Sequence, residues 1–217
     1  WMKPELDFIK QTEDSRQTIN DWVEEKTQER IQNLIPQGLI TDDTRLVLTN
    51  AIYFKSNWAN EFSQGATKDK PFTLADGSDV ECAQMYQQDR FGYTETDDLQ
   101  VLSLPYKGGD LDMLIFLPRK ADGIAGLEKQ LTRENLAKWT GALKPDDVKV
   151  TLPKWKFETS VSLSETLQAM GMKLAFKWPG ADFTAMSPTG ELYISAVVHK
   201  AFVAVDEEGT EAAAATA

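Results

Sequence analysis

The side chains that could carry out catalysis are few and widely separated in this chain. His199 is the only histidine among 217 residues, and it lies inside the apolar run 197–202, which predicts a strand interior. A serine–histidine nucleophile would have to use this residue, yet no Gly-x-Ser-x-Gly elbow, phosphate-binding loop or HExxH sequence accompanies it. The sequence therefore makes a weak case for an enzyme.

Carboxylates and thiols offer no better site. Paired carboxylates occur at Asp97-Asp98 and at Asp146-Asp147, both in turn-like segments. Because runs of charge are mostly solvated faces, we interpret these pairs as surface groups. Cys82 is the single cysteine, so the chain has neither an internal disulfide nor a cysteine–histidine cluster for zinc. The sequence thus predicts no metal and no cofactor.

Two polar residues interrupt apolar runs that we interpret as buried strands. Asn50 lies within the run 46–54, and His199 lies within a late run over 192–205. A buried polar side chain without a partner costs about 1–3 kcal/mol, so each side chain needs a hydrogen bond. The sequence leaves open whether the two residues meet or whether each bonds separately to backbone or water.

The composition is that of an acidic globular chain. Hydrophobic residues make up 41% and charged residues 26%, which is ordinary, while the formal net charge of −11 disfavours nucleic-acid and anionic-membrane surfaces. No apolar run approaches the roughly 20 residues of a membrane span. None of the six asparagines begins an Asn-x-Ser/Thr sequon, which together with the lone cysteine favours a prokaryotic source. The chain starts at Trp1, so we expect that it begins inside a longer protein.

Helix and strand signals predict the first elements that would hold these side chains. Residues 14–35 place apolar side chains mostly on one face with helical spacing, and Asp14 with Gln17 resembles a capping box. Residues 46–54 are almost continuously apolar and rich in β-branched and aromatic side chains. We therefore expect a helix followed by a strand buried on both faces.

Turn signals organise the rest of the chain. Asp76-Gly77 and the glycines at 108–109 lie between apolar runs and predict two hairpins, over 72–85 and 99–117. We then expect a helix over 124–143, a strand over 148–157, a short helix over 163–170 and a long strand over 192–205. No repeat or linker divides these elements, so we predict a single α+β domain over residues 1–217 with a large, mostly antiparallel sheet system.

Several of these segments resemble, in order, the strands of the serpin family. TNAIYFKSNW at 49–58 resembles the third strand of sheet A, residues 104–118 the sheet B hairpin, and VTLPKWKF at 150–157 the sixth strand of sheet A. VHKAFVAVDEEGTEAA at 198–213 resembles the fifth strand running into the reactive-loop hinge. The resemblance implies the serpin fold, with a large central sheet A, further sheets and surrounding helices. It also implies that the chain is incomplete at both ends.

The resemblance implies an inhibitor and not an enzyme. In the family, a serine-type peptidase cleaves a mobile loop, which then inserts into sheet A and traps the acyl-enzyme. The implied partners are a serine peptidase, or alternatively a cysteine peptidase, and the remaining serpin segments. A non-inhibitory carrier or chaperone is the alternative function, and a hydrolase is a third. The compartment stays open, although the family leans toward an extracellular or cell-envelope location.

The resemblance also assigns site residues. Asn50 and His199 match the shutter, where two strands of sheet A separate. Trp58 matches the breach, where insertion begins, and Lys154 with Glu207 matches an ion pair that anchors the hinge. The proximal hinge occupies 207–217 and contains Glu207, Glu208, Gly209, Thr210, Glu211, Ala212, Ala213, Ala214, Ala215 and Thr216.

The hinge sequence suits insertion. Gly209 would supply the backbone freedom of a hinge. With a period of two, one face carries only small uncharged side chains that would enter the sheet, namely Thr210, Ala212, Ala214 and Thr216. Glu211 would lie on the other face, in solvent. If the loop has been cut, residues 210–217 should form a strand between those that contain Asn50 and His199.

Overall fold

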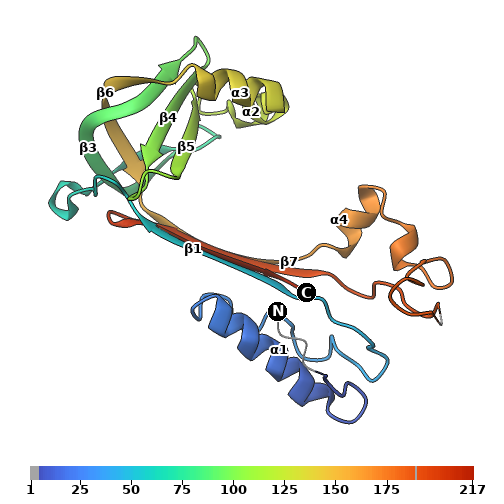
Figure 1. Ribbon diagram of the computed structural model, residues 1–217. Helices are drawn as coiled ribbons and strands as arrows, with labels where there is room; N and C mark the ends of the chain where they lie inside the picture. The colour runs from blue at the N-terminus through green and yellow to red at the C-terminus, as the bar shows by residue number, and fades with distance from the viewer. Residues whose placement is uncertain (1–4, 189) are drawn as a thin grey trace. The chain divides into compact units, whose positions relative to one another are not determined.

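The computed structural model describes residues 5–188 and 190–217 of the chain (Figure 1). The chain divides into two compact units. The first contains the described part of residues 1–54, with 157–203 and 212–217, and the second contains residues 55–156 and 204–211.

A four-stranded sheet combines one early strand with three late ones. Its strand order is β1-β9-β8-β7, and the strands are β1 (Asn50–Asn57), β7 (Trp155–Ser162), β8 (Val198–Val205) and β9 (Gly209–Thr216). Backbone hydrogen bonds join Val198 to Ala217 at one end of the β8–β9 pair, and Asp206 N–H to Gly209 C=O at the other. The strand predicted for a cut loop is therefore present, and it lies between β1 and β8.

Strand β9 is antiparallel to both of its neighbours. The end of β1 meets the start of β9, because the Trp58 N–H donates to the Glu208 C=O at 2.9 Å. It follows that β1 and β8 run in the same direction on either side of β9. Because antiparallel pairing is somewhat more stable per residue than parallel pairing, β9 gives this part of the sheet two favourable ladders.

The first unit contains helix α1 (Thr12–Lys26), which is shorter than the predicted helix over 14–35. The helix ends just before Gln28 and Glu29, whose positive φ angles of 51° and 63° are not helical, and Asn33 in the segment beyond also has a positive φ angle, of 49°. The chain then folds back, and the fully buried Asn20 side chain bonds both the N–H and the C=O of Ile35. Several apolar residues of the expected helix are still buried, namely Ile19, Val23, Ile31, Leu34 and Ile35.

The prediction of a strand buried on both faces over 46–54 was wrong. Strand β1 begins only at Asn50, and the side chains of Leu46, Leu48 and Ile52 are 48%, 68% and 58% exposed. Within the described residues, these side chains are covered only in part. An apolar run thus identified a strand but did not reveal how much of each face is covered.

The late strands differ from their predicted bounds. The single strand predicted over 148–157 is two strands, β6 (Lys144–Pro153) and β7, which belong to different sheets and break at Lys154. The long strand predicted over 192–205 begins as β8 only at Val198. Between β7 and β8 lie the predicted short helix, here α4 (Ser164–Ala169), and a 3-10 turn, η2 (Leu174–Phe176).

The second unit is built on a five-stranded antiparallel sheet. Its order is β2-β3-β4-β5 with β6 paired to β3, and the strands other than β6 are β2 (Lys68–Thr73), β3 (Asp79–Glu95), β4 (Leu99–Pro105) and β5 (Asp112–Pro118). Both predicted hairpins are confirmed. The first turns at Gly77, with φ 82°, and the second at Gly108 and Gly109, with φ 108° and 80°.

Two short helices pack on this sheet where one was predicted. The segment over 124–143 forms α2 (Ile124–Gln130) and α3 (Arg133–Gly141). The break falls at Thr132, whose hydroxyl accepts from the Asn135 N–H and caps α3. Trp139 then packs with Leu99 and Val101 in the core of the unit. A further 3-10 turn, η1 (Gln64–Ala66), precedes β2.

Candidate functional site

The turn between β8 and β9 is stabilised by the side chain of Asp206. The Asp206 carboxylate accepts from the N–H groups of Glu208 and Gly209 at 3.0 and 3.2 Å. Asp206 N–H in turn donates to the Gly209 C=O at 3.0 Å. Aspartate commonly closes turns in this way, and the result is that β9 reverses tightly against β8.

Gly209 is required by space and not by an unusual backbone angle. A Cβ atom at this position would lie 2.1 Å from the Ser56 carbonyl oxygen and 2.7 Å from the Asn57 Cα atom. Among the described residues, Gly209 is not one of the glycines with a positive φ angle. The φ freedom that we predicted for it is therefore not needed in this conformation. Its small size instead lets the start of β9 lie against the end of β1.

Glu207 connects the turn to two other segments. Lys154 Nζ lies 2.6 Å from one carboxylate oxygen, and the Thr67 hydroxyl donates to the other at 2.8 Å. The Glu207 side chain is only 8% exposed, whereas that of Lys154 is 45% exposed. The hydrogen bond from Lys154 is the main reason that the pKa of Glu207 lies below its ordinary value, and the same bond raises the pKa of Lys154. The two residues of the predicted ion pair are therefore in contact.

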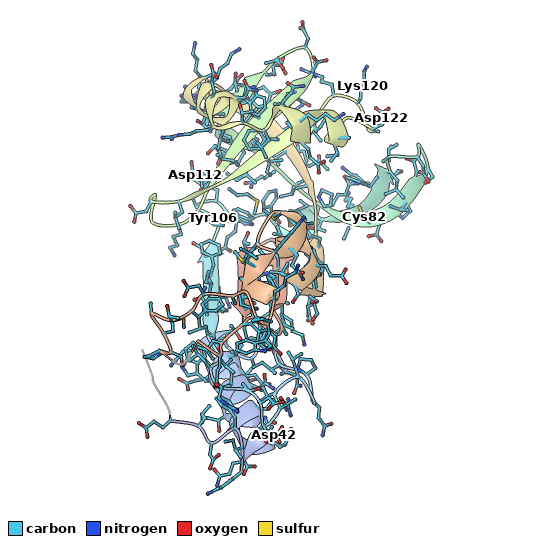
Figure 2. The ribbon with its side chains drawn as sticks, turned by 90° about the vertical axis from the view of Figure 1, so that its right-hand side faces the viewer. Asp42, Cys82, Tyr106, Asp112, Lys120 and Asp122 are labelled. Carbon is cyan, nitrogen blue, oxygen red and sulfur yellow. The ribbon has the colours of Figure 1, made fainter. Side chains whose placement is uncertain are left out.

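Trp58 lies at the centre of an aromatic cluster beside this turn. Its indole N–H donates to the Asp206 C=O at 2.9 Å, and the side chain is fully buried. The ring stacks on Tyr106, with centroids 4.8 Å apart and planes 9° apart, and meets the edge of Phe62. Figure 2 shows Tyr106 at the end of β4, near the end of β1. The cluster thus packs beside the turn that precedes β9.

Thr210 is the first β9 residue whose side chain is enclosed by this cluster. The Tyr106 hydroxyl donates to its Oγ1 at 2.8 Å, and both residues are buried. Burial raises the pKa of Tyr106 above its ordinary value. The sequence predicted only a hairpin at Tyr106, because nothing in the local pattern marks a partner 104 residues away.

The other end of β9 contains the single histidine. His199 Nδ1 lies 2.8 Å from Thr216 Oγ1, so the histidine is in contact with β9. Asn50 is the first residue of β1 and is exposed, so the prediction that it is buried was wrong. In the part of the chain that the structure describes, no hydrogen bond joins Asn50 to His199.

The buried face of β9 is only partly the predicted one. Thr210 is buried, but Ala212, Ala214 and Thr216 are only half-buried. The least exposed alanines are on the opposite face, with Ala213 at 3% and Ala215 at 2%. Glu211 shares that face, is half-buried and has a partner, so the prediction that it lies in solvent was also wrong.

The segment that follows α1 explains why the face of β9 with Ala213 and Ala215 is the more buried one. The β8–β9 register places Ala213 opposite Phe202 and Ala215 opposite Lys200, with each pair on one face of the sheet. The Arg30 guanidinium lies 5.3 Å from the centre of the Phe202 ring, and Lys200 Nζ donates to the Gln32 C=O at 2.8 Å. The folded-back segment thus covers the face of Ala213 and Ala215.

A strand that pairs antiparallel on both edges with two neighbours that run in the same direction is typical of sheets that accept an added strand. The family model described as serpin (serine protease inhibitor) matches residues 3–217. The chain therefore belongs to the serpin family.

Relatives and solved structures agree with this assignment. The leukocyte elastase inhibitor of Xenopus tropicalis is 44% identical over 98% of this chain and 58% of its own length, and human serpin B4 is 45% identical over 97% and 55%. Emu ovalbumin superposes with a TM-score of 0.93 at 32% identity, covering 97% of this chain and 55% of the other. The structure of cleaved Serpin 42Da superposes with a TM-score of 0.88 at 39% identity, covering 97% of this chain and 57% of the other. The chain thus spans less than two thirds of these proteins.

The comparisons and the structure also bear on the other predictions. The relatives named above come from a frog and from humans, so they give no support to a prokaryotic source. Among the described residues, no helix has the length and apolar character needed to cross a membrane. Within the same residues, no group of three or more His, Cys, Asp or Glu side chains is arranged to hold a metal ion.

Proposed function

We propose that this chain is the strand-accepting part of an inhibitor of serine-type endopeptidases, and that the whole protein is not an enzyme. A peptidase would cleave the reactive loop, and the freed loop would insert as β9 and trap the acyl-enzyme. The observation that carries this proposal is the position of β9 between β1 and β8. The names of the relatives, leukocyte elastase inhibitor among them, point to an elastase-like serine peptidase as the first target to test.

The chemistry of β9 supports insertion as a spontaneous step. Ordering its 8 residues costs about 1–2 kcal/mol each in backbone entropy. A strand with neighbours on both edges offsets this cost by satisfying N–H and C=O groups on both sides, and by burying its small side chains. Because alanine loses no rotamer freedom, the side chains add little to the entropic cost.

We propose three roles for the residues of the site. Trp58, Lys154 and Glu207 form the breach, where contacts to the turn fix the start of the inserted strand. Asn50 and His199 form the shutter, and only the contact from His199 to β9 supports this role in the present conformation. The hinge comprises Glu207, Glu208, Gly209, Thr210, Glu211, Ala212, Ala213, Ala214, Ala215 and Thr216.

We further propose that residues 1–217 form part of a single serpin domain and work with the remaining segments of the family. A single family model spans both compact units, which supports this view. Apolar side chains with large exposure support it too, because further segments would cover them. Examples are Leu48 at 68%, Met170 at 80%, Leu174 at 67% and Trp178 at 58%.

The alternative function is that of a non-inhibitory carrier or chaperone. A bulky or charged residue on the enclosed part of β9 would favour it, because such a residue opposes insertion. The enclosed residues here are Thr210, Ala213 and Ala215, which are small and uncharged. We therefore favour inhibition. A cysteine peptidase is the alternative target.

The test uses the full-length protein that contains this chain. It would be incubated with a panel of serine and cysteine peptidases, and the products separated on a denaturing gel. We expect a covalent complex that survives SDS with at least one serine peptidase. Cleavage of the loop by every peptidase with no such complex would contradict inhibition and favour the carrier function.

A further inference from the structure

The turn between β8 and β9 has a loop of only two residues, Glu207 and Glu208. The pair that closes it is Asp206 and Gly209, because the Asp206 N–H donates to the Gly209 C=O at 3.0 Å. The favoured two-residue hairpin loops contain positive φ angles, which glycine and asparagine supply. Neither glutamate is among the described residues with a positive φ angle. The loop sequence therefore does not by itself favour so short a turn.

The Asp206 carboxylate compensates for this unfavourable loop sequence. Across a tight turn, the Gly209 N–H would ordinarily donate to the Asp206 C=O. Here it donates to the Asp206 carboxylate at 3.2 Å, and the Glu208 N–H donates to the same oxygen at 3.0 Å. The Asp206 C=O instead accepts from the Trp58 indole N–H at 2.9 Å. The carboxylate thus takes the place of the backbone hydrogen bond that would close the turn.

The same segment could form a longer turn. Three-residue hairpin loops favour glycine as their last residue, in the left-handed region, and the sequence Glu207-Glu208-Gly209 fits this preference. Such a loop would pair Asp206 with Thr210 and shift β9 by one residue along β8. Because successive side chains point to opposite faces, this shift would move every side chain of β9 to the other face of the sheet.

The alanines of β9 give little resistance to this shift. Residues 212–215 are all alanine, so within this segment a shift by one residue exchanges alanine for alanine. Apart from Thr216, the β9 residues that differ from alanine are 209–211, and they lie next to the turn. The register is therefore decided at the turn. It is kept to the far end of the pair, where Val198 lies opposite Ala217.

We propose that Asp206 is a positioning residue that sets the register of β9 on β8 when the cleaved loop inserts. This inference rests on the proposed function and deepens it. The turn involves only four residues, so its closure costs little entropy compared with contacts farther along β9. A loop that closed with the longer turn would carry an attached peptidase one residue less far, which is about 3.4 Å. It would also present the wrong face of β9 to each side of the sheet.

Three variants of the full-length protein separate this role from a general effect on stability. Asp206→Ala removes the acceptor, whereas Asp206→Asn keeps an acceptor oxygen without the charge. Asp76→Ala is the matched control. The Asp76 carboxylate stabilises the turn between β2 and β3 in a similar way, since it accepts from the Ser78 N–H at 2.9 Å.

Engineered cysteines report the register directly. In the observed register, residues 201 and 214 form a non-hydrogen-bonded pair, whose Cα atoms lie about 4.5 Å apart, within the range of a disulfide. A shift to the longer turn would bring 201 and 215 together instead. The parent protein and each variant would therefore carry Ala201→Cys with either Ala214→Cys or Ala215→Cys, and every other cysteine, Cys82 included, would be replaced by Ser. The loop would be cleaved by a peptidase that is not trapped, and the disulfide yield measured after mild oxidation.

We expect the 201–214 disulfide in the parent protein, in Asp206→Asn and in Asp76→Ala. In Asp206→Ala, the yield of the 201–214 disulfide relative to the 201–215 disulfide should fall at least about fivefold, which is the effect of one ordinary hydrogen bond. An unchanged ratio in Asp206→Ala would overturn the proposal. So would the absence of both disulfides in that variant, or an Asp206→Asn variant that is equally impaired.

The second measurement is the ratio of trapped peptidase to cleaved inhibitor, without the engineered cysteines. We expect Asp206→Ala to lower this ratio about fivefold and Asp76→Ala to leave it near that of the parent protein. Equal losses in the two alanine variants would overturn the proposal. If the parent protein traps no peptidase but the disulfides show the change of register, the proposed function fails while the role of Asp206 stands.

Discussion

At the scale of single residues, Glu207 joins three segments of the second unit. Its carboxylate contacts Lys154 and Thr67, and its C=O accepts from the Phe62 N–H at 2.9 Å. The resemblance predicted the Lys154 contact, and the two side chains do lie together. Thr67 was not predicted, because it is 140 residues away and no local pattern marks it.

The ionisation of Glu207 leads to a prediction about pH. Its pKa is lowered mainly by the hydrogen bond from Lys154, so the charged form is favoured in the folded state. The stabilisation is complete above the ordinary glutamate pKa of about 4.3 and is lost as pH falls through the lowered value. On acidification, we expect the unfolding free energy of the loop-cleaved parent protein to fall by about 1 kcal/mol more than that of the Glu207→Gln variant.

The measurement is denaturant unfolding at a series of pH values that falls from neutral to below the ordinary glutamate pKa of about 4.3. Glu208→Gln is the matched control, because Glu208 is the next residue and its side chain is exposed. If the unfolding free energies of the parent protein and of Glu207→Gln depend on pH in the same way, the ion pair has no stabilising role.

Gly209 supports a second prediction at this scale. In Gly209→Ala the new methyl group would meet the Ser56 carbonyl, which belongs to the backbone and has little room to shift. We expect the loop-cleaved protein to lose roughly 3 kcal/mol of unfolding free energy, the upper part of the range for overpacking. Gly126→Ala, at a helical position with no atom within 4 Å of the added group, is the control and should be neutral or stabilising. Equal effects of both substitutions would show that β1 does not restrict position 209.

At the scale of elements, local signals predicted the structures that local interactions form. Both hairpins have glycine turns and lie where the sequence predicted them. The helix over 124–143 was predicted as one element because the capping role of Thr132 was not recognised. The face of β9 was only partly predicted, since the segment that covers Ala213 is distant in sequence. Alanine also has little preference for strands, so the neighbouring strands must impose this conformation.

The observed faces of β9 change the expected order of mutational effects. Ala213→Arg would put an unpaired guanidinium at a position that is only 3% exposed. We expect it to destabilise the loop-cleaved protein by about 3–5 kcal/mol. Glu208→Arg, at an exposed position of the adjoining turn, should change stability by less than about 0.5 kcal/mol. The measurement is the melting temperature of the two cleaved variants. A melting temperature of Ala213→Arg close to that of the parent protein would mean that β9 is not enclosed on this face.

At the scale of the whole molecule, the order of the four-stranded sheet places β9 between β1 and β8, the two strands that would have to separate to admit it. Strands β1 and β8 run in the same direction, so an inserted strand forms an antiparallel ladder with each. The turn at Asp206 reverses the chain directly after β8, so β9 pairs with the strand that precedes it. The family and fold class could be read from the sequence. The contacts at the entry point could not, because they join segments that are distant along the chain.

The central claim is that insertion of β9 traps the peptidase, and Thr210 offers its most direct test. Thr210→Arg would force a guanidinium into the enclosed site beside Tyr106, which should make insertion slower than release of the cleaved loop. The measurement is the number of full-length inhibitor molecules consumed per serine peptidase inactivated. We predict a value near equimolar for the parent protein and for Glu208→Arg, and a rise of more than about tenfold for Thr210→Arg, which corresponds to about 1.4 kcal/mol. A Thr210→Arg variant that traps the peptidase as efficiently as the parent protein would contradict the account.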